Sequence, residues 1–155
     1  MPWIRFTPDE PPAPSRRTPT AAGGSLDPAD YRGRGALALA FLPGDECWPL
    51  GEHLAQAVDE FLALEAEVLL VSSNELASTA AAAEPGVHLL LDRDEKLRRD
   101  YENIFEFDVR GQGLLFILNN HGAPFRAWVG PCDDPAMRVD EALRFLESAA
   151  LLCPE

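Results

Sequence analysis

The chain alternates between short apolar runs and amphipathic stretches from residue 36 onward. Runs of strand length that are apolar almost throughout are typical of strands buried on both faces of a sheet. Such runs predict strands at Ala36–Leu42, Glu67–Ser73, Val87–Leu91, Gly113–Leu118 and Phe125–Val129.

Helical periodicity fills most of the gaps between these runs. From Pro49 onward, apolar side chains recur at the spacing of one helical face, at Leu54, Val58, Phe61 and Leu62. The proline is well placed there, because its missing N–H costs nothing in a first turn. Further patterns predict short helices over residues 75–83 and 94–101, and a last helix over residues 135–150.

The resulting element order is β-α-β-α-β-α, then a β-hairpin, then a last helix. Strands separated by helices are most simply parallel with right-handed crossovers, whereas the turn Asn119–Gly122 joins the last two strands as an antiparallel pair. The predicted fold class is therefore α/β. It is a three-layer α/β/α sandwich whose mixed sheet has three parallel strands and a C-terminal antiparallel β-hairpin.

Residues 1–28 differ from the rest because they are rich in proline. Proline fixes φ and removes a backbone donor, so this stretch cannot form a central strand. We predict an irregular arm over residues 1–28 and a single domain over residues 29–155. Two alternatives stay open for the arm: a mobile tail, and a segment docked on the domain through Trp3, Ile4 and Phe6.

Composition excludes some classes of partner and indicates a cellular compartment. The 155 residues carry a formal net charge of −13 with a pI near 4.5, which argues against nucleic acid and against an anionic membrane surface as partners. No apolar run approaches the roughly 20 residues of a membrane helix, and no signal-peptide pattern is visible. Three cysteines are too few and too odd in number for a secreted disulfide framework. We therefore expect a cytoplasmic domain.

Cys47 is the strongest candidate for chemistry. It lies where the run Ala36–Leu42 meets the helix that opens at Pro49, so its sulfur is expected at the amino end of that helix. A helix N-terminus stabilises an anion by about 0.3–1 kcal/mol, and by about 2 kcal/mol where the site is partly buried. At about 1.4 kcal/mol per pKa unit, this lowers the pKa of a thiol by about one unit.

Two features oppose this effect on Cys47. Asp45 and Glu46 place negative charge beside the thiol, and the sequence has no arginine or lysine between residues 34 and 93. We therefore expect a mildly nucleophilic thiol. The alternative is an inert cysteine packed under Trp48 as a small hydrophobic side chain.

Four segments, in this order along the chain, carry a family resemblance. They are Ser25–Gly33 (SLDPADYRG), Phe41–Cys47 (FLPGDEC), Leu90–Tyr101 (LLDRDEKLRRDY) and Phe116–Gly122 (FILNNHG). In them the chain resembles a thioredoxin-fold redoxin, most closely the peroxiredoxin branch of the alkyl hydroperoxide reductases and thiol-specific antioxidant proteins. The resemblance covers residues 25–146. It implies a thioredoxin-like fold in which Cys47 is the peroxidatic, or attacking, cysteine.

The active-site motif is degenerate when it is compared with that family. A thioredoxin has a second cysteine where this chain has Leu50, and a peroxiredoxin has threonine or serine where this chain has Gly44. The family's proline or arginine before the penultimate strand corresponds to Gly113. Arg110, three residues earlier, is the candidate cation for stabilising the thiolate, because its loop is expected at the same end of the sheet as Cys47.

Cys132 is the candidate resolving thiol. It lies in the turn Gly130–Asp134, and the inferred direction of the last strand brings this turn toward the end of the sheet that holds Cys47. Two cysteines whose Cα atoms lie within about 7 Å can form a disulfide, so the pair would act as attacking and resolving thiols. The alternative is a loop cysteine without a partner. Cys153, near the C-terminus, is expected to be unimportant; the alternative is a resolving or intermolecular thiol on a flexible tail.

The predicted function is a thiol-dependent oxidoreductase that needs no cofactor. The Cys47 thiolate would attack a peroxide or a protein disulfide, with a thioredoxin-type protein as reductant. No metal site is predicted, because His53, His88 and His121 form no zinc-ligand spacing with the cysteines. The alternative, from another class, is a redox-inactive thioredoxin-fold module that binds a protein partner; the missing second active-site cysteine and the acidic neighbours of Cys47 favour it.

Overall fold

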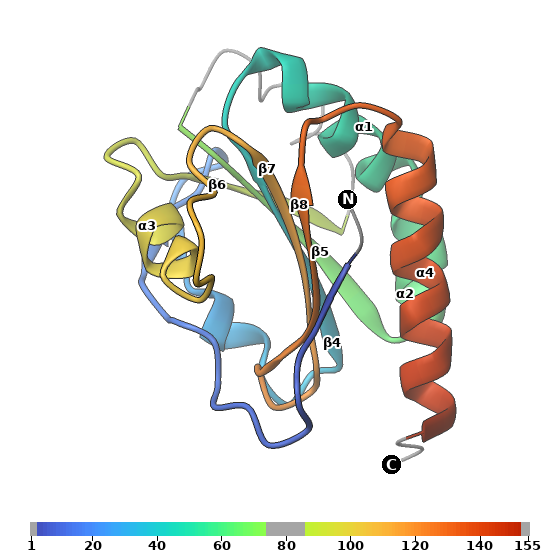
Figure 1. Ribbon diagram of the computed structural model, residues 1–155. Coiled ribbons are helices and arrows are strands. Elements are labelled where there is room, and N and C mark those ends of the chain that lie inside the picture. Colours follow the sequence, from blue (N-terminus) through green and yellow to red (C-terminus); the bar gives the residue numbers. More distant parts are fainter. Residues whose placement is uncertain (1–2, 74–85, 153–155) are drawn as a thin grey trace.

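One mixed sheet with helices on both faces forms the body of the protein (Figure 1). The computed structural model describes residues 3–73 and 86–152. The sheet has six strands: β1 (Ile4–Arg5), β4 (Ala36–Leu42), β5 (Ala66–Ser72), β6 (Val87–Leu91), β7 (Gly113–Leu118) and β8 (Pro124–Gly130). Their spatial order is β1-β8-β7-β4-β5-β6. Strands β4, β5 and β6 are parallel, and the hairpin of β7 and β8 is antiparallel. The predicted fold class is confirmed.

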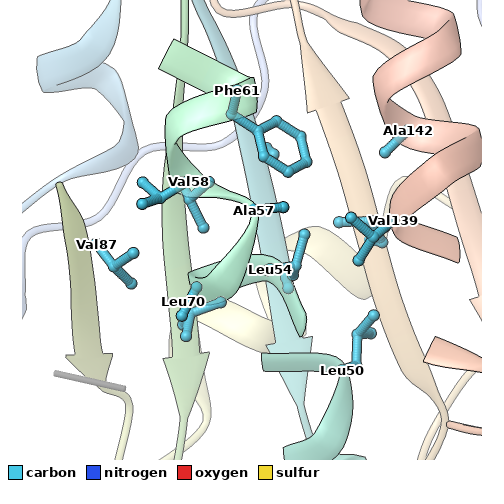
Figure 2. Close-up of a cluster of buried hydrophobic side chains, with 14 of the residues drawn as sticks. Leu50, Leu54, Ala57, Val58, Phe61, Leu70, Val87, Val139 and Ala142 are labelled. Carbon is cyan, nitrogen blue, oxygen red and sulfur yellow. The ribbon is translucent and has the colours of Figure 1, made fainter. Parts of the chain in front are cut away.

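Helices cover the two faces of this sheet unequally. One face carries α1 (Trp48–Gln56), α2 (Val58–Ala63) and α4 (Pro135–Leu152), and the other carries α3 (Lys96–Glu102) (Figure 1). Ala38 and Ala40 of β4 belong to the cluster beneath the first three helices, whereas Leu37 and Leu39 belong to the cluster beneath α3. Figure 2 shows part of the first cluster, where Leu54, Phe61 and Val139 point toward one another. Because both faces are covered, β4 is apolar throughout.

The long helical pattern over residues 49–62 is interrupted. The sequence predicts one helix, and the structure has two, because the backbone leaves the helical path at Ala57 (φ −95°, ψ 9°). The Ala57 N–H is shared between two carbonyl oxygens of the preceding turn, at 3.1 and 3.2 Å. Phe61 is fully buried, but Leu62, which was expected on the same face, is 45 % exposed. The helix predicted over residues 75–83 lies outside the described residues.

Helix α3 begins at Lys96, two residues later than the pattern predicts. The delay has a backbone cause, since Glu95 adopts a left-handed conformation with φ 59°. The Asp92 carboxylate then accepts hydrogen bonds from the N–H groups of Leu97 and Arg98, at 3.1 and 2.9 Å. A carboxylate in this place satisfies free donors at the helix N-terminus, so Asp92 fixes how α3 sits on the sheet.

The proline-rich arm is largely irregular and is docked on the domain. Its short elements are β1, β2 (Thr18–Pro19), β3 (Ser25–Leu26) and, at its end, the 3₁₀ turn η1 (Pro28–Tyr31). Strand β1 pairs with β8, and Trp3 Nε1 donates a hydrogen bond of 2.9 Å to Glu141 on α4. The Tyr101 hydroxyl donates to the Pro14 carbonyl oxygen at 2.7 Å. The structure therefore shows the docked alternative, while the domain boundary at residue 28 stays a prediction.

Two buried tyrosines predict a loss of stability at alkaline pH. Burial raises the pKa of Tyr31 to about 12 and also raises the pKa of Tyr101. In the unfolded chain a tyrosine loses its proton near pH 10, so above that pH the folded state binds more protons than the unfolded state. The free energy of unfolding should then fall as the pH rises from about 10 to 12, on the order of 1 kcal/mol per pH unit for each tyrosine.

Urea unfolding at pH 9, 10 and 11 measures this slope. The double variant Tyr31→Phe/Tyr101→Phe should show a flatter dependence on pH, whatever its stability at neutral pH. An unchanged slope in that variant would show that these two phenols are not the titrating groups.

No helix in residues 3–73 and 86–152 has the length and apolar character needed to cross a membrane.

Candidate active site

Cys47 lies at the amino end of α1. It ends a 3₁₀ turn, η2 (Asp45–Cys47), and is the N-cap residue of the helix. Its N–H donates a hydrogen bond of 3.0 Å to the Gly44 carbonyl oxygen, which closes the turn. The residue is only 3 % exposed and belongs to the core cluster beneath α1. The sequence placed this cysteine correctly, and the helix N-terminus it caps favours the thiolate over the thiol.

A disulfide joins Cys47 to Cys132, and the two Cα atoms lie 4.8 Å apart. Cys132 follows β8, in the connection that leads to α4. Because β7 is antiparallel to β4 and β8 is antiparallel to β7, β8 ends at the same end of the sheet as β4. The proximity predicted for the two cysteines is therefore observed, and the structure is that of the oxidised protein.

Gly113 provides the space for the sulfur of Cys132. A β-carbon on Gly113 would lie 2.5 Å from Cys132 Sγ and 3.4 Å from the indole ring of Trp128. Trp128 is fully buried, so the ring offers little room to move. The backbone of Gly113 does not need glycine, since its φ lies outside the left-handed region. The departure from the family pattern at this position thus has a steric reason: any side chain would enter the space of the disulfide.

Arg110 has a different partner from the one expected. Its guanidinium pairs with Asp108 at 2.8 Å, and its side chain is 81 % exposed. Hydrogen bonds from Arg110 lower the pKa of Asp108 to about 2. In the oxidised structure the guanidinium of Arg110 binds this carboxylate. A role for Arg110 in stabilising the Cys47 thiolate therefore stays a prediction.

Arg98, on α3, is a buried cation that sequence reasoning missed. Its side chain is 7 % exposed. Nε donates to Glu102 at 2.8 Å, and Nη2 donates to the carbonyl oxygens of Val109 and Gln112 at 3.1 and 2.6 Å. Among the described residues, Nη1 has no hydrogen-bond partner. The available signal was helical spacing, because Arg98 lies three residues before the buried Tyr101.

A small pocket lies beside Arg98, at the ends of β4 and β5. Its interior has room for about one water molecule. The side chains that shape it include Leu42, Pro43, Ser72, Ser73, Asp92 and Arg98. Pro43 begins the loop that leads from β4 to Cys47, so the pocket adjoins the active-site loop.

Metal ligands do not gather within the part of the chain that the structure describes: no group of three or more histidine, cysteine or acidic side chains could hold an ion there. Cys153 lies outside the described residues.

Solved structures of peroxiredoxins are similar to this chain over most of its length. Peroxiredoxin Q from Xanthomonas campestris shares 24 % sequence identity with a TM-score of 0.71, covering 87 % of this chain and 91 % of that one. Peroxidoxin BcpB from Mycobacterium tuberculosis shares 15 % (TM-score 0.71, 90 % and 96 % covered). Thioredoxin peroxidase I from Plasmodium yoelii shares 19 % (TM-score 0.73, 90 % and 89 % covered). At these identities the likeness shows a shared fold, the thioredoxin-like fold of peroxiredoxins.

No protein of curated function matches the chain. The model of the AhpC/TSA family matches residues 10–123. This segment is well over half of the chain, and it includes Cys47. This agrees with the resemblance carried by the four sequence segments and with the fold. The chain therefore belongs to the AhpC/TSA family.

Proposed function

We propose that the protein is a thiol-dependent peroxidase in which Cys47 attacks the peroxide and Cys132 resolves the product. The observation that carries this proposal is the disulfide between these two cysteines at the amino end of α1. The AhpC/TSA family uses a peroxide and a thiol reductant in general. A structure of the similar Xanthomonas campestris bacterioferritin comigratory protein is described as a trapped intermediate of alkyl peroxide reduction, which also favours a peroxide over a protein disulfide as substrate.

The reaction proceeds in two steps. Together the two thiols supply the two electrons that reduce the peroxide. The Cys47 thiolate attacks one oxygen of the peroxide, so that an S–O bond forms and the O–O bond breaks; the leaving oxygen takes up a proton and departs as water or an alcohol. The Cys132 thiolate then attacks the sulfur of the Cys47 sulfenic acid. The S–S bond forms, the S–O bond breaks, and the second oxygen leaves as water.

An external dithiol of the thioredoxin type would restore both thiols. Cys47 is nearly inaccessible in the oxidised structure, whereas Cys132 is only partly buried. The reductant should therefore attack the sulfur of Cys132 and release Cys47 as the leaving thiolate. We also propose a cytoplasmic location, where a disulfide is usually transient and catalytic rather than structural.

Intact mass after one equivalent of hydrogen peroxide tests the proposal. The reduced protein should lose two hydrogens within seconds, and peptide mapping should place the new disulfide between Cys47 and Cys132. Added thioredoxin and its reductase should then restore the mass and sustain peroxide consumption. If the reduced protein does not form the disulfide under this treatment, the disulfide is structural and is not a product of peroxide reduction. That result would favour the second candidate, a redox-inactive module that binds a partner through this end of the sheet.

A further inference from the structure

Cys132 is the half of the disulfide that an external thiol can reach. Cys47 is 3 % exposed, whereas Cys132 is only partly buried, in the loop that follows β8. A thiolate attacks one sulfur of a disulfide from the side opposite the sulfur that leaves. A reductant must therefore bring its thiolate to the surface around Cys132, with the sulfur of Cys47 as the leaving group.

Three exposed carboxylates lie around this sulfur. Asp133 and Asp134 follow Cys132 in the chain, and Glu46 precedes Cys47; we call these three residues the acidic rim. The Cα atoms of the two cysteines lie 4.8 Å apart, and consecutive Cα atoms lie about 3.8 Å apart. Each Cα atom of the acidic rim is therefore within about 9 Å of the Cα atom of Cys132. This is about the distance over which charges act in physiological salt.

Nearby cations are bound to other carboxylates and do not neutralise the acidic rim. Arg110, in the loop before β7, pairs with Asp108 at 2.8 Å, and Arg138, near the start of α4, pairs with Glu141. In the part of the chain that the structure describes, the carboxylates of the acidic rim form no ion pair. The charge beside the disulfide is therefore negative, and it has the same sign as the net charge of −13.

We propose that the reductant of this protein is a dithiol protein with a positively charged surface around its thiols, and that the acidic rim selects it over anionic thiols. The inference rests on the peroxidase function proposed above. A free thiolate is itself an anion and is repelled at this surface, and glutathione carries a further net negative charge. A protein can hold its thiolate on a basic surface, which converts the repulsion into attraction and speeds the encounter.

The reduction then takes two steps. The first thiolate of the reductant attacks the sulfur of Cys132; a bond forms between these two sulfurs, the bond to Cys47 breaks, and Cys47 leaves as a thiolate. The second thiolate of the reductant attacks the first sulfur of the reductant and releases Cys132 as a thiolate. The reductant is oxidised to its own disulfide, and its two electrons reduce the disulfide of this protein.

Two small thiols of opposite charge test the selection on the oxidised protein. Cysteamine carries an ammonium group, and 2-mercaptoethanesulfonate carries a sulfonate. The rate of reduction is measured by acid quench, alkylation and intact mass. Each rate constant is divided by that of the same thiol with 2-hydroxyethyl disulfide, a neutral disulfide, so that differences in thiol pKa and nucleophilicity cancel.

The normalised rate constant should be at least about 10-fold larger for cysteamine than for the sulfonate at low ionic strength (about 0.01 M), the lower end of the range for charge-steered encounters. In 1 M NaCl the ratio should fall to within about twofold, because the Debye length is then about 3 Å. This comparison uses wild-type protein alone, so it decides the matter even if a variant does not fold.

Neutralising the acidic rim should remove the discrimination. In the triple variant Glu46→Gln/Asp133→Asn/Asp134→Asn, the ratio at low ionic strength should fall to within about threefold. The substitutions keep the shape of each side chain, and asparagine tolerates the positive φ of residue 134.

A matched control removes three exposed carboxylates far from the disulfide. Asp9→Asn/Glu60→Gln/Glu147→Gln changes the net charge by the same amount. Asp9 lies in the arm beyond β1, which runs antiparallel to β8 and so away from Cys132. Glu60 lies on α2 and Glu147 lies in the later turns of α4, which runs away from the end of the sheet where α1 begins (Figure 1). This variant should keep the wild-type ratio within about twofold.

A ratio close to one in wild-type protein at low ionic strength would overturn the inference and leave the peroxidase function standing. A ratio that persists in the acidic-rim variant, or that the control variant loses equally, would assign the discrimination to the overall charge and would overturn it too. These measurements use no peroxide, so failure of the proposed function is read separately, from the treatment of the reduced protein with hydrogen peroxide. A disulfide that neither thiol reduces would overturn this inference and the proposed catalytic cycle together.

Discussion

Replacing Cys47 with serine should slow peroxide consumption by at least about 10³-fold, the scale seen when an enzyme loses its nucleophile. Serine cannot form an anion near neutral pH, and a thiolate rather than a thiol is the attacking species. The Cys132→Ser variant should behave differently. Its Cys47 should still be oxidised at close to the wild-type rate, but the product should remain a sulfenic acid, visible as the gain of one oxygen in intact mass and as an adduct with dimedone.

The two serine variants are matched controls for each other. Both lose the same disulfide, which closes a loop between residues 85 positions apart and is worth at most about 4–5 kcal/mol by its effect on the unfolded chain. Their thermal unfolding midpoints should therefore be lowered by similar amounts, and a difference between them in peroxide chemistry cannot arise from stability. If Cys47→Ser reacts and Cys132→Ser does not, the attacking and resolving roles are reversed.

The sheet could be predicted because each strand has two buried faces. Residues 36–42 and 87–91 are strands with the same bounds as their apolar runs. The break at Ala57 could not be read from the same pattern, because the buried side chains on either side of it keep helical spacing. Local hydrogen bonding at one residue decides that break, and periodicity averages over several turns.

The pair of cysteines could be predicted from topology alone. Once the last two strands are taken as a hairpin, the direction of β8 carries Cys132 to the end of the sheet where Cys47 lies. No side-chain detail enters that argument. The role of Gly113 beneath the sulfur could not be predicted, because it depends on atomic packing between strands rather than on their order.

The buried arginine could not be singled out from the sequence. Arg98 and Arg99 are adjacent and chemically the same, yet the first is buried among carbonyl oxygens and the second is exposed. The rotation of α3 about its own axis decides between them. That rotation is set by the left-handed Glu95 and by the Asp92 carboxylate that caps the helix. The spacing from Tyr101 is compatible with burial of Arg98, but neither of the features that set the rotation has a periodic signal, so the hydrophobic pattern alone does not choose between the two arginines.

Replacing Gly113 with valine should separate the two steps of the reaction by geometry rather than by removing a thiol. Valine suits an extended strand, and the backbone at residue 113 needs no left-handed conformation. Its β-carbon would lie 2.5 Å from Cys132 Sγ, with a backbone oxygen and the Trp128 ring as the next neighbours. Cys132 must then move away, at an overpacking cost of about 1–3 kcal/mol.

The Gly113→Val protein should therefore be oxidised at Cys47 at close to the wild-type rate. It should then accumulate sulfenic acid, because about 2 kcal/mol of strain at closure slows formation of the disulfide by about 30-fold. Gly44→Ala is the control: it lies in the loop of Cys47, and its new methyl group meets only the flexible end of Glu46, at 3.0 Å. Stopped-flow oxidation followed by acid quench and intact mass measures both steps. Disulfide closure at the wild-type rate in Gly113→Val would mean that Cys132 reaches Cys47 without occupying the space above Gly113.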